Sequence, residues 1–176
     1  MSIQKIESWF HDYHQDIYNF LIYYVGSTDV EDMLQEVFIR ALKGIHTFRG
    51  DSNPKTWLFS IARNIAVDVK RKEKSDFQKV SALQNQIDVG NVHAATPEEA
   101  FELDQRKSEL IAAIRTLKQN YQDVIFLRAL KEFSIEETAE ILGWKTNKVS
   151  VTYHRAIKTL RDHLIEKGGY PEWIDL

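Results

Sequence analysis

The stretch NPKTWLFSIARNIAVDVKRKEK, residues 53–74, combines strong helix signals with an amphipathic pattern. Asn53 is a favourable N-cap, and Pro54 follows at the first helical position, where its fixed φ suits a helix. Residues recurring at the helical period predict a core face: Trp57, Leu58, Ile61, Ala62, Ile65, Ala66 and Val69. The opposite face should carry Thr56, Ser60, Arg63, Val67, Lys70 and Lys74, with Phe59 and Asn64 on the flanks.

The polar face of this helix has two interpretations. A basic helix end is common because cations are favourable near a helix C-terminus. Aromatic and amide side chains beside a basic track are also the groups that bind single-stranded nucleic acid. Residues 54–74 contain six Lys or Arg against two acidic residues, a net charge of +4. A solvated helix end and a nucleic-acid surface both remain open from this helix alone.

The composition of the whole chain indicates an all-α protein. Its 176 residues include three prolines and seven glycines, and apolar residues recur at helical spacing almost throughout. This length allows one domain or two small helical domains. The absence of cysteine excludes disulfides, thiolate catalysis and Cys-ligated zinc. No apolar run is long enough to span a bilayer and the N-terminus lacks a signal-peptide layout, so we expect a soluble cytoplasmic protein.

Charge is divided unevenly along the chain. The total is −3, but residues 26–40 carry a net −3, whereas residues 54–74 and 145–167 each carry +4. Local sums decide which surfaces attract polyanions. The pattern predicts two contacts with polyanions and one contact with a different partner.

The first part of the chain predicts helices around residues 3–25 and 31–44. Thr28 and Glu31 form a capping-box pattern before the second helix. An acidic first turn can simply complement the helix dipole, and this is one interpretation of Asp29 and Glu31. The dipole explains less of the presence of the acidic residues that lie further into the helix. Residues 45–52, IHTFRGDS, form a short loop with an exposed-looking Phe48. Loops held between rigid helices often carry function.

A change of composition at residue 75 predicts a linker over residues 75–95, followed by a second helical domain. Capping boxes open helices at Thr96 and Ser134, and a further helix is expected over residues 121–130. Gly143 suits a turn between two helices that would form a helix-turn-helix. The second of these would direct its N-terminal half towards a DNA major groove. Other three-helix packings produce a similar pattern, so DNA binding is one reading of it.

Taken together, three segments resemble the extracytoplasmic function sigma factors of bacteria. DVEDMLQEVFIRAL resembles the segment that docks on the coiled coil of the RNA polymerase largest subunit. FRGDSNPKTWLFSIARNIAVDVKRK resembles the segment that melts the promoter and reads its −10 element. FSIEETAEILGWKTNKVSVTYHRAIKTLR resembles the helix-turn-helix that reads the −35 element. The order, spacing and intervening linker also match this family.

The resemblance implies a division into residues 1–74 for polymerase docking and −10 recognition, a flexible linker at 75–95 and a −35-reading domain at 96–167. The linker would thread towards the RNA exit path. The implied polymerase contacts are Asp32, Gln35 and Glu36. Two groups of residues are implied to contact single-stranded −10 DNA. The loop that captures a base consists of Phe48, Arg49, Gly50, Asp51 and Ser52, with Asn64 beside it. The residues that would bind phosphates are Lys55, Arg63, Lys70, Arg71, Lys72 and Lys74. Trp57 belongs to the family's TWL motif, but its apolar face favours a core position.

The implied contacts with double-stranded −35 DNA lie on the second helix of the helix-turn-helix. They are Thr146, Asn147, Lys148, Ser150, Val151, Thr152, His154, Arg155 and Lys158. Ser150 and Val151 stand where members often have Arg or another polar base reader, so His154, Arg155 and DNA shape should carry more of the recognition. The tail at 168–176, GGYPEWIDL, has no counterpart in the common pattern and either folds back on the last domain or contacts a partner.

The predicted function is therefore that of a sigma factor, with no catalysis of its own. No pair or triad has catalytic spacing, and the chain has no Gly-rich phosphate loop, so no cofactor or metal is expected. The resemblance also implies an anti-sigma partner. A stand-alone helix-turn-helix regulator is the alternative, and the acidic helix and the loop before Asn53 speak against it.

Overall fold

A computed structural model describes residues 2–83 and 105–166, and every regular element in these ranges is helical. The chain separates into two compact units, Met1–Thr96 and Pro97–Leu176. The expected capping box at Thr96 and the aromatic tail lie outside the described residues. Within the described part of the chain, no helix has both the length and the hydrophobicity that crossing a membrane requires.

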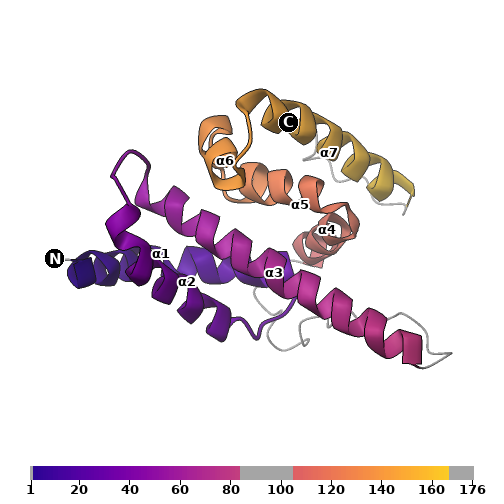
Figure 1. Ribbon diagram of the computed structural model, residues 1–176. Coiled ribbons are helices and arrows are strands. Elements are labelled where there is room, and N and C mark those ends of the chain that lie inside the picture. The colour runs from indigo at the N-terminus through magenta and orange to yellow at the C-terminus, as the bar shows by residue number, and fades with distance from the viewer. Residues whose placement is uncertain (1, 84–104, 167–176) are drawn as a thin grey trace. The chain divides into compact units, whose positions relative to one another are not determined.

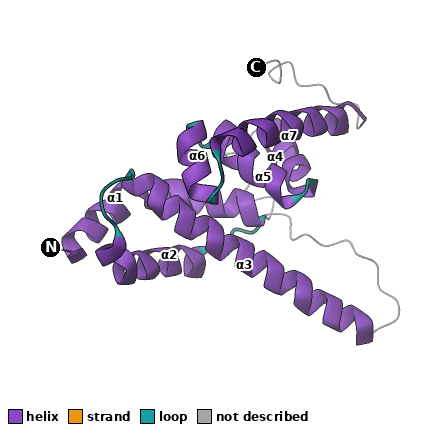
Figure 2. Ribbon diagram, turned by 45° about the horizontal axis from the view of Figure 1, so that its top comes forward, coloured by secondary structure: helices purple, strands orange, loops and turns teal. Residues whose placement is uncertain are grey.

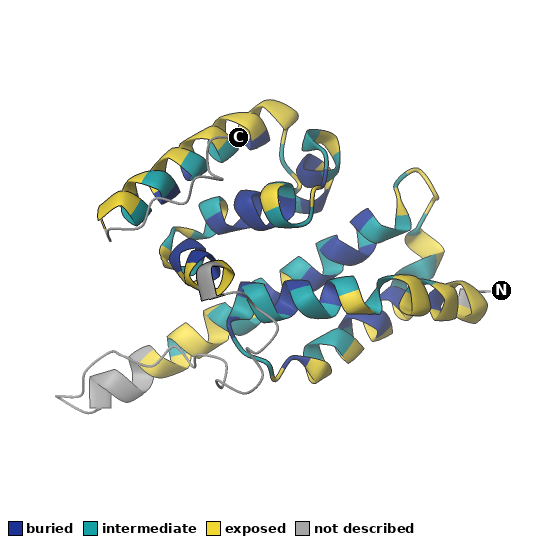
Figure 3. Cartoon of the chain, turned by 180° about the vertical axis from the view of Figure 1, so that it is seen from behind, coloured by how far each residue is buried: buried dark blue, intermediate teal, exposed yellow. Residues whose placement is uncertain are grey.

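The first unit is built from three long helices (Figure 1). These are α1 (Ser2–Val25), α2 (Glu31–Gly44) and α3 (Pro54–Leu83), and a 3-10 turn, η1 (Ile45–Thr47), follows α2. Each long helix packs against the other two. Their largest fully buried side chains include Ile17, Phe20, Leu21, Tyr24, Val37, Leu58 and Phe59. Figure 3 shows this buried layer between the helices and the exposed outer faces.

The start of α3 follows the sequence prediction. The Asn53 side-chain oxygen accepts a hydrogen bond from the Lys55 N–H at 2.9 Å, which satisfies one of the donors left open at the helix start. The end of α3 differs from the prediction, since the helix continues to Leu83, through the first nine residues of the expected linker. The change to a polar composition at residue 75 therefore does not mark the end of the helix.

Other predictions for this unit were wrong. The capping box of Thr28 and Glu31 does not form, because buried Val30 is the N-cap and α2 begins only at Glu31. Thr56 and Phe59, expected on the polar face and the flank of α3, are both buried. Packing against α1 and α2 together buries a wider arc of α3 than a single apolar stripe.

The second unit contains α4 (Gln105–Thr116), α5 (Gln119–Ile125), a π-helical turn η3 (Phe126–Leu130), α6 (Ile135–Leu142) and α7 (Thr146–Glu166). Figure 2 shows that helices and short loops account for both units. Helix α7 packs on α4, α5 and α6. The core includes Ile114, Val124, Ile125, Phe126, Leu127, Val149, Ala156 and Leu160. The helix expected over 121–130 is thus present, but it begins at Gln119 and changes to π geometry after Ile125.

The turn between α6 and α7 is defined by two caps. Ser134 and Glu137 form the predicted reciprocal capping box at the start of α6. At its end Gly143 has φ +64, and the Trp144 N–H donates to the Ala139 carbonyl at 2.8 Å. These are the features of a glycine-dependent Schellman motif. The caps stop α6 after eight residues and direct the chain into α7, as a helix-turn-helix requires.

Candidate docking and nucleic-acid surfaces

The acidic face of α2 is accessible. Asp32 and Gln35 are exposed, and Glu36 is half-buried. The Glu36 carboxylate accepts a hydrogen bond from the Arg40 Nε at 2.6 Å within the same helix. An exposed pair of this kind stabilises a helix by only about 0.3–0.5 kcal/mol, so a partner's cation could replace Arg40 at little cost. Asp32 and Glu36 can therefore both meet a basic surface.

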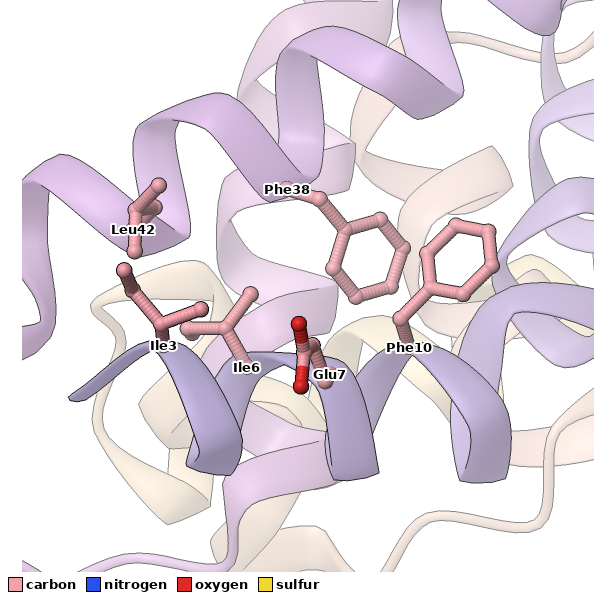
Figure 4. A pocket seen from close by; sticks show the side chains of 6 residues that line it. All are labelled: Ile3, Ile6, Glu7, Phe10, Phe38 and Leu42. Atoms are coloured by element: carbon pink, nitrogen blue, oxygen red, sulfur yellow. The ribbon is translucent and has the colours of Figure 1, made fainter. Parts of the chain in front are cut away.

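The same helix also borders an apolar groove. The groove has a volume of 340 Å³ and is lined by Ile3, Ile6, Glu7, Phe10, Phe38 and Leu42. Figure 4 shows the side chains of α1 and α2 facing one another across it. The rings of Phe10 and Phe38 meet edge to face with centroids 4.8 Å apart. Phe10 and Leu42 are both exposed, although they are large apolar residues.

Three aromatic rings hold the loop between η1 and α3. The Phe48 ring lies 5.1 Å from Trp9 and 5.2 Å from Trp57, and the two tryptophans are 6.0 Å apart. Phe48 is thus half-buried rather than exposed, and Trp57 is half-buried rather than a core residue. Sequence reasoning missed Trp9 as a neighbour of this loop, since no local pattern links α1 with residue 48.

The loop beyond Phe48 is open. Arg49, Gly50 and Asp51 are exposed, and Ser52 is half-buried. Gly50 has φ +80, a conformation that other residues rarely adopt, and a Cβ there would have nothing within 4 Å. The backbone turn, rather than crowding, therefore accounts for this glycine. The loop presents a cation, an anion and a hydroxyl on a rigid aromatic base.

The basic side chains of α3 differ in their surroundings. The Lys55 ammonium lies 2.7 Å from the Asp16 carboxylate, and the Lys70 ammonium lies 5.0 Å from the centre of the Tyr24 ring. Arg71 lies 3.7 Å from Asp68, and Arg63 donates to the exposed Asn64 at 3.5 Å. Two further lysines, Lys72 and Lys74, are exposed. Part of the positive charge on α3 is therefore already balanced by the protein itself.

The first half of α7 presents a mostly polar face. Its exposed residues are Thr146, Asn147, Lys148, Ser150, Val151, His154 and Arg155, with Lys158 one turn further and Thr152 half-buried.

Two of these side chains already have contacts in the same helix or turn. The Ser150 hydroxyl donates to the Thr146 carbonyl at 3.2 Å. The Lys148 ammonium lies 4.0 Å from the centre of the Trp144 ring. Val151, at 41% exposure, is an apolar side chain in the middle of this polar face.

Within residues 2–83 and 105–166, no three His, Asp or Glu side chains come together as metal ligands. Burial lowers the pKa of the Arg115 guanidinium at the end of α4. Nearby, the Gln122 amide donates to the carbonyls of Arg115 and Leu117 at 2.9 and 2.6 Å, so this polar cluster closes the C-terminus of α4.

Comparison with known proteins shows the family of this chain. Residues 9–75 match the family model for sigma-70 region 2, and residues 107–160 match the model for sigma-70 region 4. The ECF RNA polymerase sigma factor SigX of Bacillus subtilis (strain 168) is 40% identical over 155 residues, covering 86% of this chain and 79% of SigX. The chain belongs to the ECF RNA polymerase sigma factors.

Further relatives of this sigma factor extend the comparison. The RNA polymerase sigma factor YlaC of the same strain is 32% identical over 91% of this chain and 92% of YlaC. The ECF RNA polymerase sigma-E factor of Escherichia coli (strain K12) is 30% identical over 82% of this chain and 78% of that protein. The protein thus directs promoter-specific initiation of transcription by RNA polymerase. Sigma factors are not enzymes, as the sequence predicted.

Solved structures share the fold of this sigma factor. The sigma factor RpoE of Bartonella quintana, in complex with the anti-sigma factor NepR, matches with a TM-score of 0.71 at 24% identity, covering 92% of this chain and 97% of RpoE. CnrH, in complex with the cytosolic domain of CnrY, matches with a TM-score of 0.69 at 19% identity over 94% and 90% of the two chains. At these identities the likeness supports the all-helical fold, with its region 4 helix-turn-helix.

Proposed function

We propose that the acidic face of α2 binds the clamp coiled coil in the largest subunit of RNA polymerase. Asp32, Gln35 and Glu36 lie within about two turns of one another on one side of the helix. Opposite charges across such an interface speed association and suppress wrong partners. One observation carries the proposal. The acidic face of α2 is accessible, whereas the exposed side of α3 in the same unit is basic.

The loop after η1 and the basic side of α3 bind the melted −10 element. Arg49, Gly50, Asp51 and Ser52 form the pocket for a base taken out of the stack, with Asn64 beside it. Phosphates of the single strand then contact the basic residues of α3: Lys55, Arg63, Lys70, Arg71, Lys72 and Lys74. Phe48 takes a different role from the one expected, because its ring packs on Trp9 and Trp57. It supports the loop from beneath.

The first half of α7 reads the duplex −35 element in the major groove. Asn147, His154 and Arg155 are exposed and carry hydrogen-bonding groups that match base edges. The other polar side chains contact backbone phosphates and fix the orientation of the helix on the duplex. They are Thr146, Lys148, Ser150, Thr152 and Lys158. The exposed methyl groups of Val151 suit the C5-methyl group of a thymine.

An anti-sigma factor controls access to these surfaces in the cytoplasm. This part of the proposal is supported by the solved structures, since RpoE of Bartonella quintana was solved in complex with the anti-sigma factor NepR, and CnrH in complex with the cytosolic domain of CnrY. A protein that covers the acidic face of α2 would compete with polymerase. Its binding should therefore be mutually exclusive with binding of core polymerase.

Charge reversal on α2 tests the docking step. Asp32→Arg should weaken binding to core polymerase at least about a hundredfold, because like charges at an interface cost several kcal/mol. Thermal unfolding should stay close to that of the parent, since Asp32 is exposed. Binding is measured by titrating labelled sigma factor with purified core polymerase at moderate salt.

Asp29→Arg is the matched control, because it makes the same charge change in the exposed loop just before α2. It should bind nearly as well as the parent. If the parent, Asp32→Arg and Asp29→Arg bind core polymerase equally well, the acidic face is not part of the interface. If the parent itself fails to bind core polymerase while folded and binds duplex DNA alone, stand-alone DNA recognition by α7 becomes the better description.

A further inference from the structure

We propose that Trp144 is a positioning residue for recognition of the −35 element. Its indole ring holds the Lys148 ammonium at the N-terminal end of α7, where that ammonium contacts a phosphate of the duplex. The inference rests on the proposed role of α7 and deepens it, because Trp144 belongs to the turn before the helix and is not one of the predicted DNA contacts. Trp144 acts through Lys148 and contacts no base.

Lys148 occupies an unfavourable position in α7. It is the third residue of the helix, whose first turn, residues 146–149, contains no acidic residue. The N-terminal end of a helix is positive, so a cation is disfavoured there and an acidic residue would be favoured. Lys145 precedes the helix and adds a second positive charge. Natural proteins break such local rules mainly at functional sites. A DNA phosphate is the ligand that suits this concentration of positive charge.

The contact between Lys148 and Trp144 restrains the lysine. The ammonium lies 4.0 Å from the centre of the indole ring, within the range of a cation–π interaction. Trp144 is half-buried in the turn, where its backbone N–H donates to the Ala139 carbonyl at 2.8 Å. Gly143, with φ +64, shapes the same turn. The ring is therefore attached to a defined part of the helix-turn-helix, and it offers its face to a side chain that is otherwise flexible.

A ring holds a cation without neutralising its charge. On α3, by contrast, the Lys55 ammonium lies 2.7 Å from the Asp16 carboxylate, which balances its charge. An indole ring carries no net charge, so the positive charge of Lys148 stays available to a phosphate. Within residues 105–166, no carboxylate lies within ion-pair distance of Lys148. The lysine is thus restrained before DNA binds, which reduces the conformational entropy lost on binding.

The register of α7 places Lys148 near the border of the major groove. Lys148, Val151 and Arg155 follow at intervals of three and four residues, which keeps them on one side of the helix. Lys148 and Arg155 are seven residues apart, which is about 10 Å along a helix. The major groove is about 12 Å wide. With Arg155 at base edges, Lys148 therefore lies close to the phosphate backbone, where a contact fixes the orientation of the helix.

A double-mutant cycle tests the pair. Trp144→Leu keeps an apolar side chain in the turn but removes the ring, and Lys148→Gln removes the charge. Trp144→Leu should weaken binding of the reconstituted holoenzyme to a −35-dependent promoter about two- to fivefold, the range expected for an exposed cation–π pair. In the Lys148→Gln background, Trp144→Leu should cause no further loss, because the lysine that the ring holds is absent.

Lys145→Gln is the matched control, because it removes the same charge from an exposed lysine beside Trp144 in the sequence. The losses caused by Lys145→Gln and Trp144→Leu should multiply, since no contact couples the two side chains. Trp144→Phe should retain part of the binding, because a phenyl ring also attracts a cation but less strongly than indole. Urea unfolding of each variant checks that the second unit is still folded.

Fluorinated tryptophans at position 144 cover the case in which Trp144→Leu unfolds. Fluorine hardly changes the size of the indole but withdraws electrons from its face, which weakens a cation–π contact. Binding of the holoenzyme to the −35-dependent promoter should weaken stepwise as the number of fluorine atoms rises. In the Lys148→Gln variant, the same series should leave binding unchanged.

Salt dependence tests the phosphate contact of Lys148. Lys148→Gln should reduce the slope of log affinity against log salt by about 0.9, as expected when one phosphate contact with duplex DNA is lost. Trp144→Leu should change this slope less, because the charge of Lys148 is still present.

Two results would overturn the inference. If the losses caused by Trp144→Leu and Lys148→Gln multiply, the ring only shapes the turn. If Lys148→Gln leaves the salt slope unchanged, Lys148 contacts no phosphate. Failure of the proposed function gives a different result, because binding of the parent holoenzyme would then not depend on the −35 sequence. The parent protein therefore separates the two failures.

Discussion

The two helices proposed to meet promoter DNA, α3 and α7, lie in segments of equal net charge, but their basic side chains have different surroundings. Residues 54–74 and 145–167 each sum to +4. On α3, Lys55, Lys70 and Arg71 lie against an acid or a ring of the same unit. On α7, His154, Arg155 and Lys158 are exposed. The net charge of a segment therefore does not say which of its cations are available to a polyanion.

This difference follows from the position of each helix in its unit. Helix α3 packs on both α1 and α2, so its side chains lie close to those of other elements. The first half of α7 buries Val149 and leaves most other positions exposed. We infer that α3 supports the loop before it and offers only part of its charge to phosphates, whereas α7 reads DNA through its own side chains.

The largest expected effect tests the reading role of α7. Arg155→Ala and His154→Ala should each reduce transcription from a −35-dependent promoter about 10- to 100-fold, because a good contact to a base contributes about 1–3 kcal/mol of discrimination. Run-off transcription with the reconstituted holoenzyme is the measurement. Thr159→Ala, on the same helix, is the control. An equal loss of transcription on a template with a scrambled −35 element would mean that both residues contact only phosphates.

A second prediction tests whether Phe48 supports the loop. Phe48→Ala should lower the free energy of unfolding of the first unit by about 2 kcal/mol, because two aromatic pairs are lost. It should also weaken binding of a single-stranded −10 oligonucleotide, and Phe48→Leu should recover part of both losses. Urea unfolding and oligonucleotide titration measure these quantities. A loss of binding with unchanged stability would mean that Phe48 stacks directly on a base.

A third, smaller effect concerns Val151 and thymine. Replacing thymine by uracil removes only the C5-methyl group, and at one −35 position this should weaken promoter binding about three- to fivefold. Val151→Ala should weaken binding to the promoter with thymine by the same factor. Its binding should not change further when uracil replaces thymine. Holoenzyme binding to a promoter selected from random sequences is the measurement. Unchanged uracil sensitivity in the variant would exclude the contact.

The smallest effect tests the unequal availability of cations on α3. Lys72→Ala with Lys74→Ala should reduce the slope of log affinity against log salt by about 1.4 for a single strand, as expected when two phosphate contacts are lost. Lys55→Ala should change it by less than about 0.7, because Lys55 already pairs with Asp16. Equal changes per lysine would show that the Asp16 pair opens freely on binding.

Local patterns predicted the helices better than they predicted their surroundings. The cap at Asn53, the capping box at Ser134 and the turn at Gly143 were all predicted, because each depends on a few neighbouring residues. The cap at Thr28 failed because burial of Val30 moved the helix start.

The long-range contacts could not be predicted from local patterns. The rings around Phe48 and the groove at Leu42 join residues more than thirty positions apart, and no local periodicity specifies such contacts. The resemblance assigned candidate site residues to α2, α3, α7 and the loop before α3, and the structure shows which of these side chains contact other groups of the protein.

The aromatic residues also make the two units optically distinct. Trp9 and Trp57 lie against the loop residue Phe48, and Trp144 lies at the turn before α7 with the Lys148 ammonium over its ring. A nearby cation and ring stacking both alter indole emission, so Trp9 and Trp57 report on the loop after η1, whereas Trp144 reports on the turn before α7. Variants that keep only Trp57 or only Trp144 would therefore let DNA binding at each of these surfaces be followed separately in the free sigma factor, without an added dye.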